Sequence, residues 1–446
     1  MQQLRNKKRL WCLSLAVVLG LTSLAACGKS TPTESYSDNV VSYEEGSDLT
    51  SDIITPAPDG AADPTDAPTT AADTSQTTRP RGEKTTAPVA SNTTTTKAPA
   101  DTQRKTPAPA TEKDALSNSL YALTTDKKLT VGYIGGSVTV GTGATFENTG
   151  SWRALTTQWL KSTYPNAQIT EGNAAIGATG SLHGACRVQH QLLQPYNPDL
   201  VFVEFSINDR YQGYTQDQSE RYMESLVRMV REHNPYADIV LVYVTDSGQK
   251  TSDTDAIYAF NTVATRYHLP VLDVGKALYT READAASCFK DGVHPNDKGY
   301  ACYARYVQEF LQQYLTGGAA QKAHAMPAAG RSDLLMNPTY YSAEDIAKAN
   351  PGADEGLMDT GLEIIDSATL NLSFSGKTVV MCWQTKGGSI YATLDGQSRR
   401  KILNVNGDGT QRIILENLAA GNHQLKLEVK GTIQKPVVIQ RIYTFQ

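Results

Sequence analysis

Two short motifs hold side chains of the types that form a hydrolytic triad. Ser137 follows two glycines after a short apolar run, and His294 lies three residues beyond Asp291. A serine hydroxyl is a poor nucleophile at neutral pH, so it needs an imidazole to accept its proton, and the imidazole needs a carboxylate to fix its tautomer. Asn208 closes another apolar run, where its amide is able to support an oxyanion. These residues predict a hydrolytic site built on serine, histidine and aspartate.

The elements that must position these residues follow from the hydrophobic pattern between Lys128 and about Leu315. Apolar runs alternate there with stretches of helical spacing, which indicates βαβ units and a parallel sheet. The expected strands are 129–134, 200–205, 239–244 and 271–274, and the expected helices are 152–164, 223–230 and 300–315. Ser137 and Asn208 both come just after an expected strand. Sites in open parallel sheets form outside the carboxyl ends of the strands, so the chemistry agrees with the expected fold.

Four ordered blocks in this segment resemble the SGNH (GDSL-type) hydrolases. They are Gly-Gly-Ser-Val-Thr at 135–139, Asn-Ala-Ala-Ile-Gly-Ala-Thr-Gly at 173–180, Val-Glu-Phe-Ser-Ile-Asn-Asp at 203–209 and Asp-Gly-Val-His at 291–294. The similarity covers the chain from about 128 to 315. It implies an α/β domain with a three-layer, flavodoxin-like α/β/α fold around a parallel sheet, and ester hydrolysis without a metal or another cofactor.

The resemblance assigns a role to each matching position. Ser137 would be the nucleophile, His294 the base and Asp291 the residue that orients the base. The oxyanion donors would be the backbone N–H of Ser137, a backbone N–H of the second block and the Asn208 side chain. Glu204, alone in an apolar strand, is either a carboxylate that supports the site or a solvated residue at a strand end.

The second oxyanion donor has two candidates. Many relatives have a glycine where this chain has Ala178, with Gly177 just before it. The donor is a backbone N–H, so an alanine can supply it where its φ and ψ suit the turn. We therefore expect the donor to be Gly177 or Ala178. The rival α/β-hydrolase nucleophile elbow, Gly-x-Ser-x-Gly, is missing because position 139 is threonine.

A rival chemistry would use a metal on the helix that carries His183, Cys186 and His190. These residues share one helix face, and their spacing is able to hold a metal ion. No fourth ligand is apparent, and partly buried neighbours on one helix explain the same pattern. We therefore expect no metal site. Two further cysteines, Cys288 and Cys302, bracket the histidine motif, and a disulfide between them would hold the catalytic loop.

The N-terminal region has the pattern of an exported lipoprotein. Basic residues within 5–9 precede an apolar stretch from Leu10 to about Ala26, which is short for a spanning helix and ends in small residues. Leu-Ala-Ala-Cys at 24–27 resembles a bacterial lipobox, in which the thiol, here that of Cys27, receives a diacylglycerol. The alternative is an ordinary signal with an incidental cysteine. We expect a lipid anchor on Cys27, membrane attachment through that lipid, and a place in the bacterial cell envelope outside the cytoplasm.

Composition and pattern divide the chain into five parts. We expect a lipoprotein signal peptide at 1–27, a disordered Thr/Pro/Ala-rich linker at 28–115, the hydrolase domain at 116–318, a connector at 319–363 and a β-sandwich accessory domain at 364–446. A polar linker of this kind cannot bury enough apolar surface to offset its conformational entropy.

The last part of the chain changes to short strands with turn signals between them and no helical pattern, which is typical of a β-sandwich. The expected strands are 369–374, 377–383, 389–394, 411–415, 424–429 and 437–445. Trp383 and Tyr391 are candidates for a platform on which a sugar stacks. The alternative is that both are core aromatic residues of a domain that only packs.

Charge and architecture together suggest the substrate class. The chain has 41 Lys and Arg against 46 Asp and Glu, a net charge of −5, with no basic cluster outside the signal, which argues against nucleic acid as a partner. We expect removal of a small acyl group, such as acetyl, from a polysaccharide or another carbohydrate ester. The acylated carbohydrate is then the partner. The alternatives are an acyltransferase that modifies a surface glycan and a non-catalytic glycan-binding lipoprotein.

Overall fold

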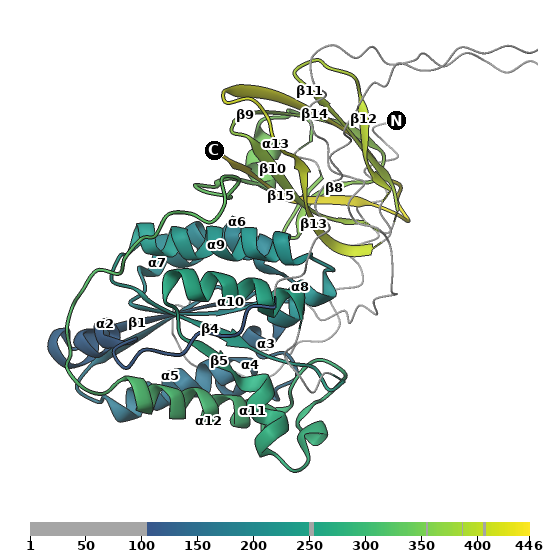
Figure 1. The fold of residues 1–446 in the computed structure, drawn as a ribbon. Coiled ribbons are helices and arrows are strands. Elements are labelled where there is room, and N and C mark those ends of the chain that lie inside the picture. The colour runs from purple at the N-terminus through teal and green to yellow at the C-terminus, as the bar shows by residue number, and fades with distance from the viewer. Residues whose placement is uncertain (1–104, 249–253, 354–355, 386, 405–406) are drawn as a thin grey trace, which may run out of the picture. The chain divides into compact units, whose positions relative to one another are not determined.

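A computed structural model of the chain describes residues 105–248, 254–353, 356–385, 387–404 and 407–446 (Figure 1). The expected signal peptide, the lipidation site at Cys27 and most of the 28–115 linker lie outside these residues. Within the described part of the chain, no helix is both long and apolar enough to cross a membrane.

A five-stranded parallel sheet forms the centre of the first domain. Its strands are β1 (Lys128–Gly135), β2 (Gln168–Asn173), β3 (Leu200–Glu204), β4 (Asp238–Tyr243) and β5 (Val271–Asp273), in the order β2-β1-β3-β4-β5. In chain order, β1 comes first, β2 pairs with one edge of β1, and the chain then crosses over so that β3 pairs with the other edge. Such a change of direction leaves a crevice at the carboxyl ends of β1 and β3, which is where ligands bind in this class of sheet.

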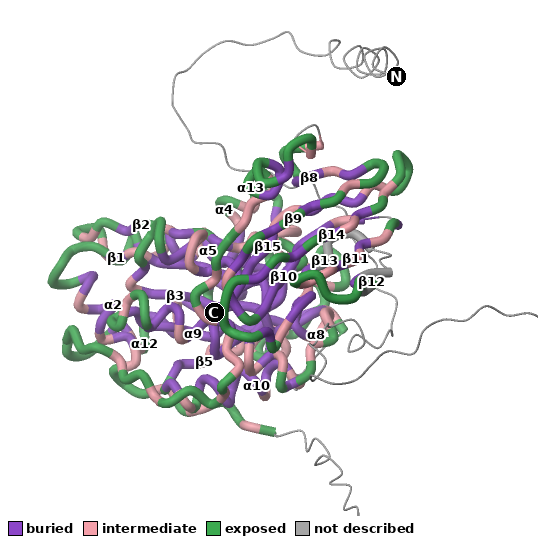
Figure 2. Tube along the Cα trace, turned by 90° about the horizontal axis from the view of Figure 1, so that it is seen from above, coloured by how far each residue is buried: buried purple, intermediate pink, exposed green. Residues whose placement is uncertain are grey.

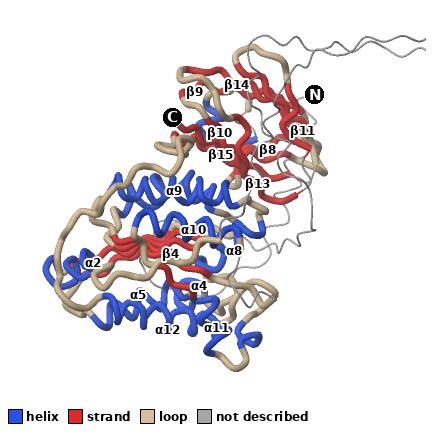
Figure 3. Tube along the Cα trace, in the orientation of Figure 1, coloured by secondary structure: helices blue, strands red, loops and turns tan. Residues whose placement is uncertain are grey.

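Helices cover both faces of this sheet and make three layers (Figures 1 and 3). One face packs against α2 (Ser117–Tyr121), α5 (Trp152–Thr163), α11 (Val274–Arg281) and α12 (Asp297–Tyr314). The other packs against α6 (Ser181–Val188), α9 (Gln216–His233) and α10 (Asp255–Tyr267). The described residues of β3 and β4 are all buried, as expected of strands covered on both faces (Figure 2). The expected α/β/α architecture is confirmed.

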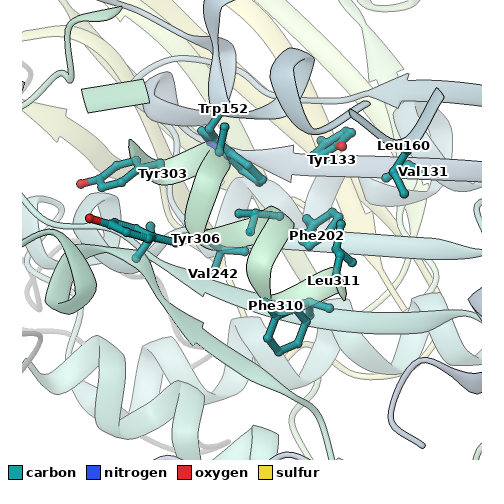
Figure 4. Packing of buried hydrophobic residues seen from close by; sticks show 14 of the residues in the cluster. Val131, Tyr133, Trp152, Leu160, Phe202, Val242, Tyr303, Tyr306, Phe310 and Leu311 are labelled. Atoms are coloured by element: carbon teal, nitrogen blue, oxygen red, sulfur yellow. The ribbon is translucent and has the colours of Figure 1, made fainter. Parts of the chain in front are cut away.

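Aromatic packing fixes α5 against the sheet (Figure 4). Tyr133 of β1 stacks on Phe202 of β3 with ring centroids 5.3 Å apart. Trp152, the first residue of α5, meets both rings edge-on, at 5.4 Å from Tyr133 and 5.8 Å from Phe202. Contacts of this kind add to the free energy gained by burying the rings. They secure β1 beside β3, next to the turn that carries Ser137.

The described end of the chain forms two antiparallel sheets around a common hydrophobic core, which confirms the expected β-sandwich. One sheet contains β13 (Gly407–Leu415), β10 (Thr378–Thr385), β15 (Val437–Phe445), β8 (Gly361–Ile364) and β7 (Leu357–Met358), with β6 (Thr339–Ser342) also paired to β15. The other contains β12 (Arg400–Asn404), β11 (Ser389–Leu394), β14 (Asn422–Lys430) and β9 (Ser367–Ser375).

The structure differs from the sequence-based expectations in several places, and it also contains elements that those expectations did not include, α10 and β12 (Arg400–Asn404) among them. The connector 319–363 is more than a linker, because β6, α13 (Ala343–Lys348), β7 and the first residues of β8 lie in it, and β6 and β8 both pair with β15. The strand β2 was not expected, because it is an edge strand with polar, partly exposed residues. Trp383 is fully buried in the core, which agrees with the core-aromatic alternative and excludes it from a sugar platform. The guanidinium of Arg399 lies 3.9 Å from the centre of the Tyr391 ring and occupies one face of it.

Candidate active site

Ser137 lies at the carboxyl end of β1, as the first residue of the short helix α3 (Ser137–Val140). Gly136, just before it, has extended φ and ψ and makes the sharp turn from strand to helix. The turn is tight, because a Cβ built on Gly136 would come within 2.0 Å of Oδ1 of Asn208. A side chain at position 136 would therefore displace the Asn208 amide or the turn itself, and Ser137 beside it is half-buried.

Ser137, His294 and Asp291 form a continuous hydrogen-bonded chain. Nε2 of His294 lies 2.9 Å from Oγ of Ser137, and Nδ1 of His294 lies 2.8 Å from Oδ2 of Asp291. The other carboxylate oxygen of Asp291 accepts hydrogen bonds from the backbone N–H groups of Val293 and His294, each at 2.7 Å. Burial alone would raise the pKa of Asp291, but these hydrogen bonds from His294 and Val293 outweigh it and hold the pKa below its usual value. Asp291 is thus kept ionised and faces the imidazole.

The loop that carries Asp291 and His294 is closed at its base by backbone hydrogen bonds. Phe289 forms a bridge with Pro295, and the N–H of Lys290 donates to the carbonyl of His294 over 2.9 Å. Asn296 then caps α12, since its side chain accepts a hydrogen bond from the N–H of Gly299. Together these contacts hold the loop at the start of α12.

A second contact supports the same loop from the end of β4. The backbone N–H and the hydroxyl of Ser247 each donate to the carbonyl of Gly292 at 3.0 Å. The hydroxyl of Tyr279, on α11, donates in turn to the carbonyl of Ser247 at 2.9 Å. The position of His294 therefore depends on Ser247, which follows β4, and on Tyr279 of α11, as well as on the contacts within its own loop.

Asn208 lies in α8 (Ser206–Tyr211), which follows β3 directly. The sheet places the ends of β3 and β1 side by side, with Gly135 paired to Glu204. This pairing brings the buried Asn208 side chain against Gly136 and so beside Ser137. The Asn208 amide therefore lies near the position at which Oγ of Ser137 would attack a substrate carbonyl.

Gly177 and Ala178 form an exposed turn across from Ser137. A Cβ built on Gly177 would lie 3.7 Å from Cβ of Ser137, which is ordinary contact. Ala178 has φ of 56°, a left-handed conformation that is costly for a residue with a Cβ. Among the described residues, none accepts a backbone hydrogen bond from the N–H of Gly177 or Ala178. Either N–H is thus available to a ligand.

Two buried charged residues, Glu204 and Arg187, support the site, and only Glu204 was a candidate from the sequence. Glu204 is fully buried, and its carboxylate accepts hydrogen bonds from the Thr139 hydroxyl at 2.8 Å and the Gly136 N–H at 3.4 Å. The solvated alternative for Glu204 is therefore wrong. Burial raises the pKa of Glu204 to about 7. Arg187, fully buried in α6, contacts the ends of β1 and β2, and no sequence signal separates it from an exposed helix arginine.

The cysteine and histidine hypotheses can be compared with the structure. Among the residues that the structure describes, no group of three or more His, Cys, Asp or Glu side chains is arranged to hold a metal ion. His183 and Cys186 are both buried in α6, and burial lowers the pKa of His183 well below its usual value. Cys288 and Cys302 are free, buried thiols, so the disulfide that the sequence allowed between them is not present.

The fold and the Ser137 site have the arrangement found in hydrolases of the SGNH class. Residues 133–302 match the family model described as the GDSL-like lipase/acylhydrolase family, and the chain carries a domain of that family. A multidomain esterase of Ruminococcus flavefaciens is 27% identical over 205 residues, which are 43% of this chain and 26% of the relative. The chain thus spans about a quarter of that relative's length.

Solved structures match both described domains. A two-domain esterase active on acetylated mannans has a TM-score of 0.62 and 21% identity, over 74% of this chain and 98% of that chain. The same esterase co-crystallised with mannopentaose has a TM-score of 0.60 and 20% identity, over the same shares. Similarity at this identity establishes the fold, an SGNH-like domain followed by antiparallel β-sheets.

Proposed function

We propose that the protein is a serine esterase that removes a small acyl group, such as acetyl, from a polysaccharide or another carbohydrate ester. The observation that carries the proposal is the chain of contacts from Ser137 through His294 to Asp291, at 2.9 and 2.8 Å. The acetylated-mannan activity of the structural relative and the esterase name of the sequence relative support a carbohydrate ester as substrate.

The first half of the reaction forms an acyl-enzyme. Oγ of Ser137 attacks the ester carbonyl carbon while Nε2 of His294 accepts its proton. The negative charge that develops on the carbonyl oxygen is stabilised by the N–H of Ser137, an N–H of the 177–178 turn and the amide of Asn208. When the tetrahedral intermediate collapses, the protonated imidazole gives its proton to the departing sugar hydroxyl.

Water then releases the acyl group. A water molecule takes the place of the sugar, His294 removes a proton from it, and the resulting oxygen attacks the acyl carbon on Ser137. The imidazole returns the proton to Oγ of Ser137 as the acid leaves. Asp291 stabilises the positive imidazole in both halves, because its ionised carboxylate faces Nδ1. If a glycan hydroxyl attacked the acyl-enzyme in place of water, the protein would act as an acyltransferase.

The proposal is tested by acetate release from acetylated mannan, acetylated xylan and acetylated peptidoglycan. We expect release from at least one of them by the full chain, and loss of nearly all release in Ser137→Ala. The matched control is Ser162→Ala, which removes an exposed serine hydroxyl on α5. Transfer of the acetyl group to an added glycan, with little free acetate, would favour the acyltransferase. Binding of the glycan without any turnover would favour a non-catalytic protein.

We also propose that the chain is anchored in the cell envelope by a lipid on Cys27. The proposal rests on the Leu-Ala-Ala-Cys sequence at 24–27 behind a basic and apolar leader. The Cys27→Ser variant should move the protein from the membrane fraction to the soluble fraction. Mass spectrometry of the mature N-terminus should show a diacylglycerol on Cys27, and an unmodified N-terminus elsewhere would contradict the proposal.

A further inference from the structure

Arg187 makes a set of buried hydrogen bonds beneath the candidate site. It lies on α6 and is fully buried. One guanidinium nitrogen, Nη1, donates to the carbonyl of Ala174, and the other, Nη2, donates to the carbonyl of Gly135 at 3.0 Å and to the hydroxyl of Thr179 at 3.3 Å. Nη1 also lies 3.4 Å from Oε1 of Gln191, one turn further along the chain.

Three of the four acceptors of Arg187 belong to the two segments that form the site. Gly135 is the last residue of β1 and lies two residues before Ser137. Ala174 follows the end of β2, and Thr179 ends the turn that contains Gly177 and Ala178. Arg187 therefore joins the segment of the nucleophile to both ends of the segment that supplies the second oxyanion donor.

Two of these acceptors, the Gly135 carbonyl and the Thr179 hydroxyl, also form hydrogen bonds with Ile176, next to the 177–178 turn. The carbonyl of Gly135 accepts from Arg187 and also from the N–H of Ile176 at 3.1 Å. The hydroxyl of Thr179 accepts from Arg187 and donates to the carbonyl of Ile176 at 2.8 Å. Ile176 is thus held from both sides, two residues before Ala178. The left-handed conformation of Ala178 is strained, and such strain persists only where the surroundings impose it.

Burying the charge of Arg187 costs free energy, so filling space in the core does not explain why an arginine is found at this position. Among the described residues, no carboxylate is one of the charged groups that shift the pKa of Arg187, and its guanidinium lies 5.9 Å from the ring centre of Phe205. Burial lowers the pKa of Arg187 to about 9, so the group is still charged at neutral pH. Burying an ion without an opposite charge beside it costs several kcal/mol, and an apolar side chain of similar size would avoid that cost. The flat fork of donors, which can reach several carbonyls at once, is what arginine adds.

We propose that Arg187 is a positioning residue for the oxyanion site: its guanidinium holds the 174–179 segment in register with Gly135, so that a backbone N–H of the 177–178 turn and the N–H of Ser137 face the same substrate oxygen. The inference rests on the proposed serine-esterase function. Oxyanion donors act over about 2.7–3.1 Å, so a small shift of the turn relative to Ser137 removes one of them.

The test compares Arg187→Met, Arg187→Lys, Thr179→Val and Thr179→Ser with the wild-type chain, using a chromogenic acetate ester. Loss of one oxyanion donor lowers kcat by about 10²–10³. We expect a loss in this range for Arg187→Met with KM nearly unchanged, and an intermediate loss for Arg187→Lys, because one ammonium cannot bridge Gly135, Ala174 and Thr179 together. Thr179→Val should also lower kcat, whereas Thr179→Ser, which keeps the hydroxyl, should stay close to wild type.

A second measurement separates positioning from folding. A boronic acid that forms a tetrahedral adduct with Ser137 should bind more weakly to Arg187→Met and Thr179→Val, by a factor similar to their loss of kcat. A purely structural role would lower the melting temperature and leave kcat and boronate affinity unchanged at 25 °C, which would overturn the inference. If Arg187→Met does not fold, the Thr179→Val and Thr179→Ser pair decides. A wild-type chain that neither cleaves the ester nor reacts with a serine-directed phosphonate would overturn the proposed function and the inference together.

Discussion

Nε2 of His294 lies 2.9 Å from Oγ of Ser137, although the two residues are 157 positions apart in the chain. The contact exists because β1 delivers Ser137 to the carboxyl edge of the sheet and the loop before α12 brings His294 to the same edge. The Ser247 contacts to Gly292 and the bridge between Phe289 and Pro295 hold that loop in place. The nucleophile and its base are therefore positioned by separate elements that only the fold brings together.

His294→Ala and Ser137→Ala should each lower kcat by several powers of ten, and the double variant should lose no more than either single variant. Members of a triad act as one unit, so their losses do not add. Asp291→Asn should keep the site's shape but lose the imidazole tautomer, with a fall in kcat of roughly 10⁴. Steady-state kinetics on a chromogenic acetate measure these effects. A Ser137→Ala variant with more than about a tenth of the wild-type rate would remove Ser137 from its assigned role.

Asn208→Ala should lower kcat by about 10²–10³ with KM changed only a few-fold, because an oxyanion donor interacts most strongly once charge has developed on the carbonyl oxygen. The control is Asn234→Ala, whose side-chain amide donates to the carbonyl of Pro198 and lies near the start of β4, away from the site. An effect confined to KM would instead make Asn208 a residue that binds the ground state of the substrate.

Gly136→Ala should abolish most activity, whereas Gly177→Ala should keep most of it. The added Cβ at Gly136 would lie 2.0 Å from Oδ1 of Asn208, so Asn208 or the Ser137 turn must move. The added Cβ at Gly177 would lie 3.7 Å from Cβ of Ser137, which is normal van der Waals contact. The two variants add the same methyl group on opposite sides of Ser137. Equal activity in both would show that Asn208 and Ser137 tolerate displacement and would weaken the assignment of both.

The free energy of unfolding should fall as the pH rises from about 4.5 toward 7, and Glu204→Gln should make this slope shallower. Burial raises the pKa of Glu204 from 4.5 to about 7, so in this range the folded chain binds a proton there that the unfolded chain does not. The stabilising effect of that proton is complete below 4.5 and lost above about 7. One proton corresponds to roughly 1 kcal/mol per pH unit. Urea denaturation at several pH values measures the slope, and an identical slope in wild type and Glu204→Gln would contradict the prediction.

Activity should fall in acid and should be unaffected by a chelator. Only neutral imidazole can accept the Ser137 proton, so protonation of His294 stops the reaction. Asp291 should stay ionised at the pH values at which activity falls, because its pKa is held below the usual value by hydrogen bonds from His294 and Val293. The pH profile of kcat/KM with and without EDTA tests both points. Loss of activity on metal removal, with recovery on adding zinc, would indicate a metal-activated water in place of Ser137.

Local sequence was sufficient to predict the chemistry and much of the fold. Ser137 and Asn208 each follow an apolar run that forms a buried strand, and Asp291 and His294 are close enough in sequence for one loop to join them. The strands β3 and β4 were predictable because parallel strands covered on both faces are continuously apolar. The strands β11 and β15 likewise have the predicted bounds, because their turns are marked by glycine or polar residues.

Only the tertiary structure decided the features that depend on contacts between distant segments. The strand β2 is polar and forms because β1 offers it backbone hydrogen-bonding groups, and β6 forms for the same reason beside β15. For Trp383 the sequence left a surface and a core position open, and the structure decides for the core, because its strand β10 lies between β13 and β15. Arg187 and Glu204 acquire their functions from carbonyls and hydroxyls supplied by other elements. A side chain's type and its near neighbours are encoded locally, whereas its burial and its hydrogen-bond partners are set by how the sheet brings remote strand ends together.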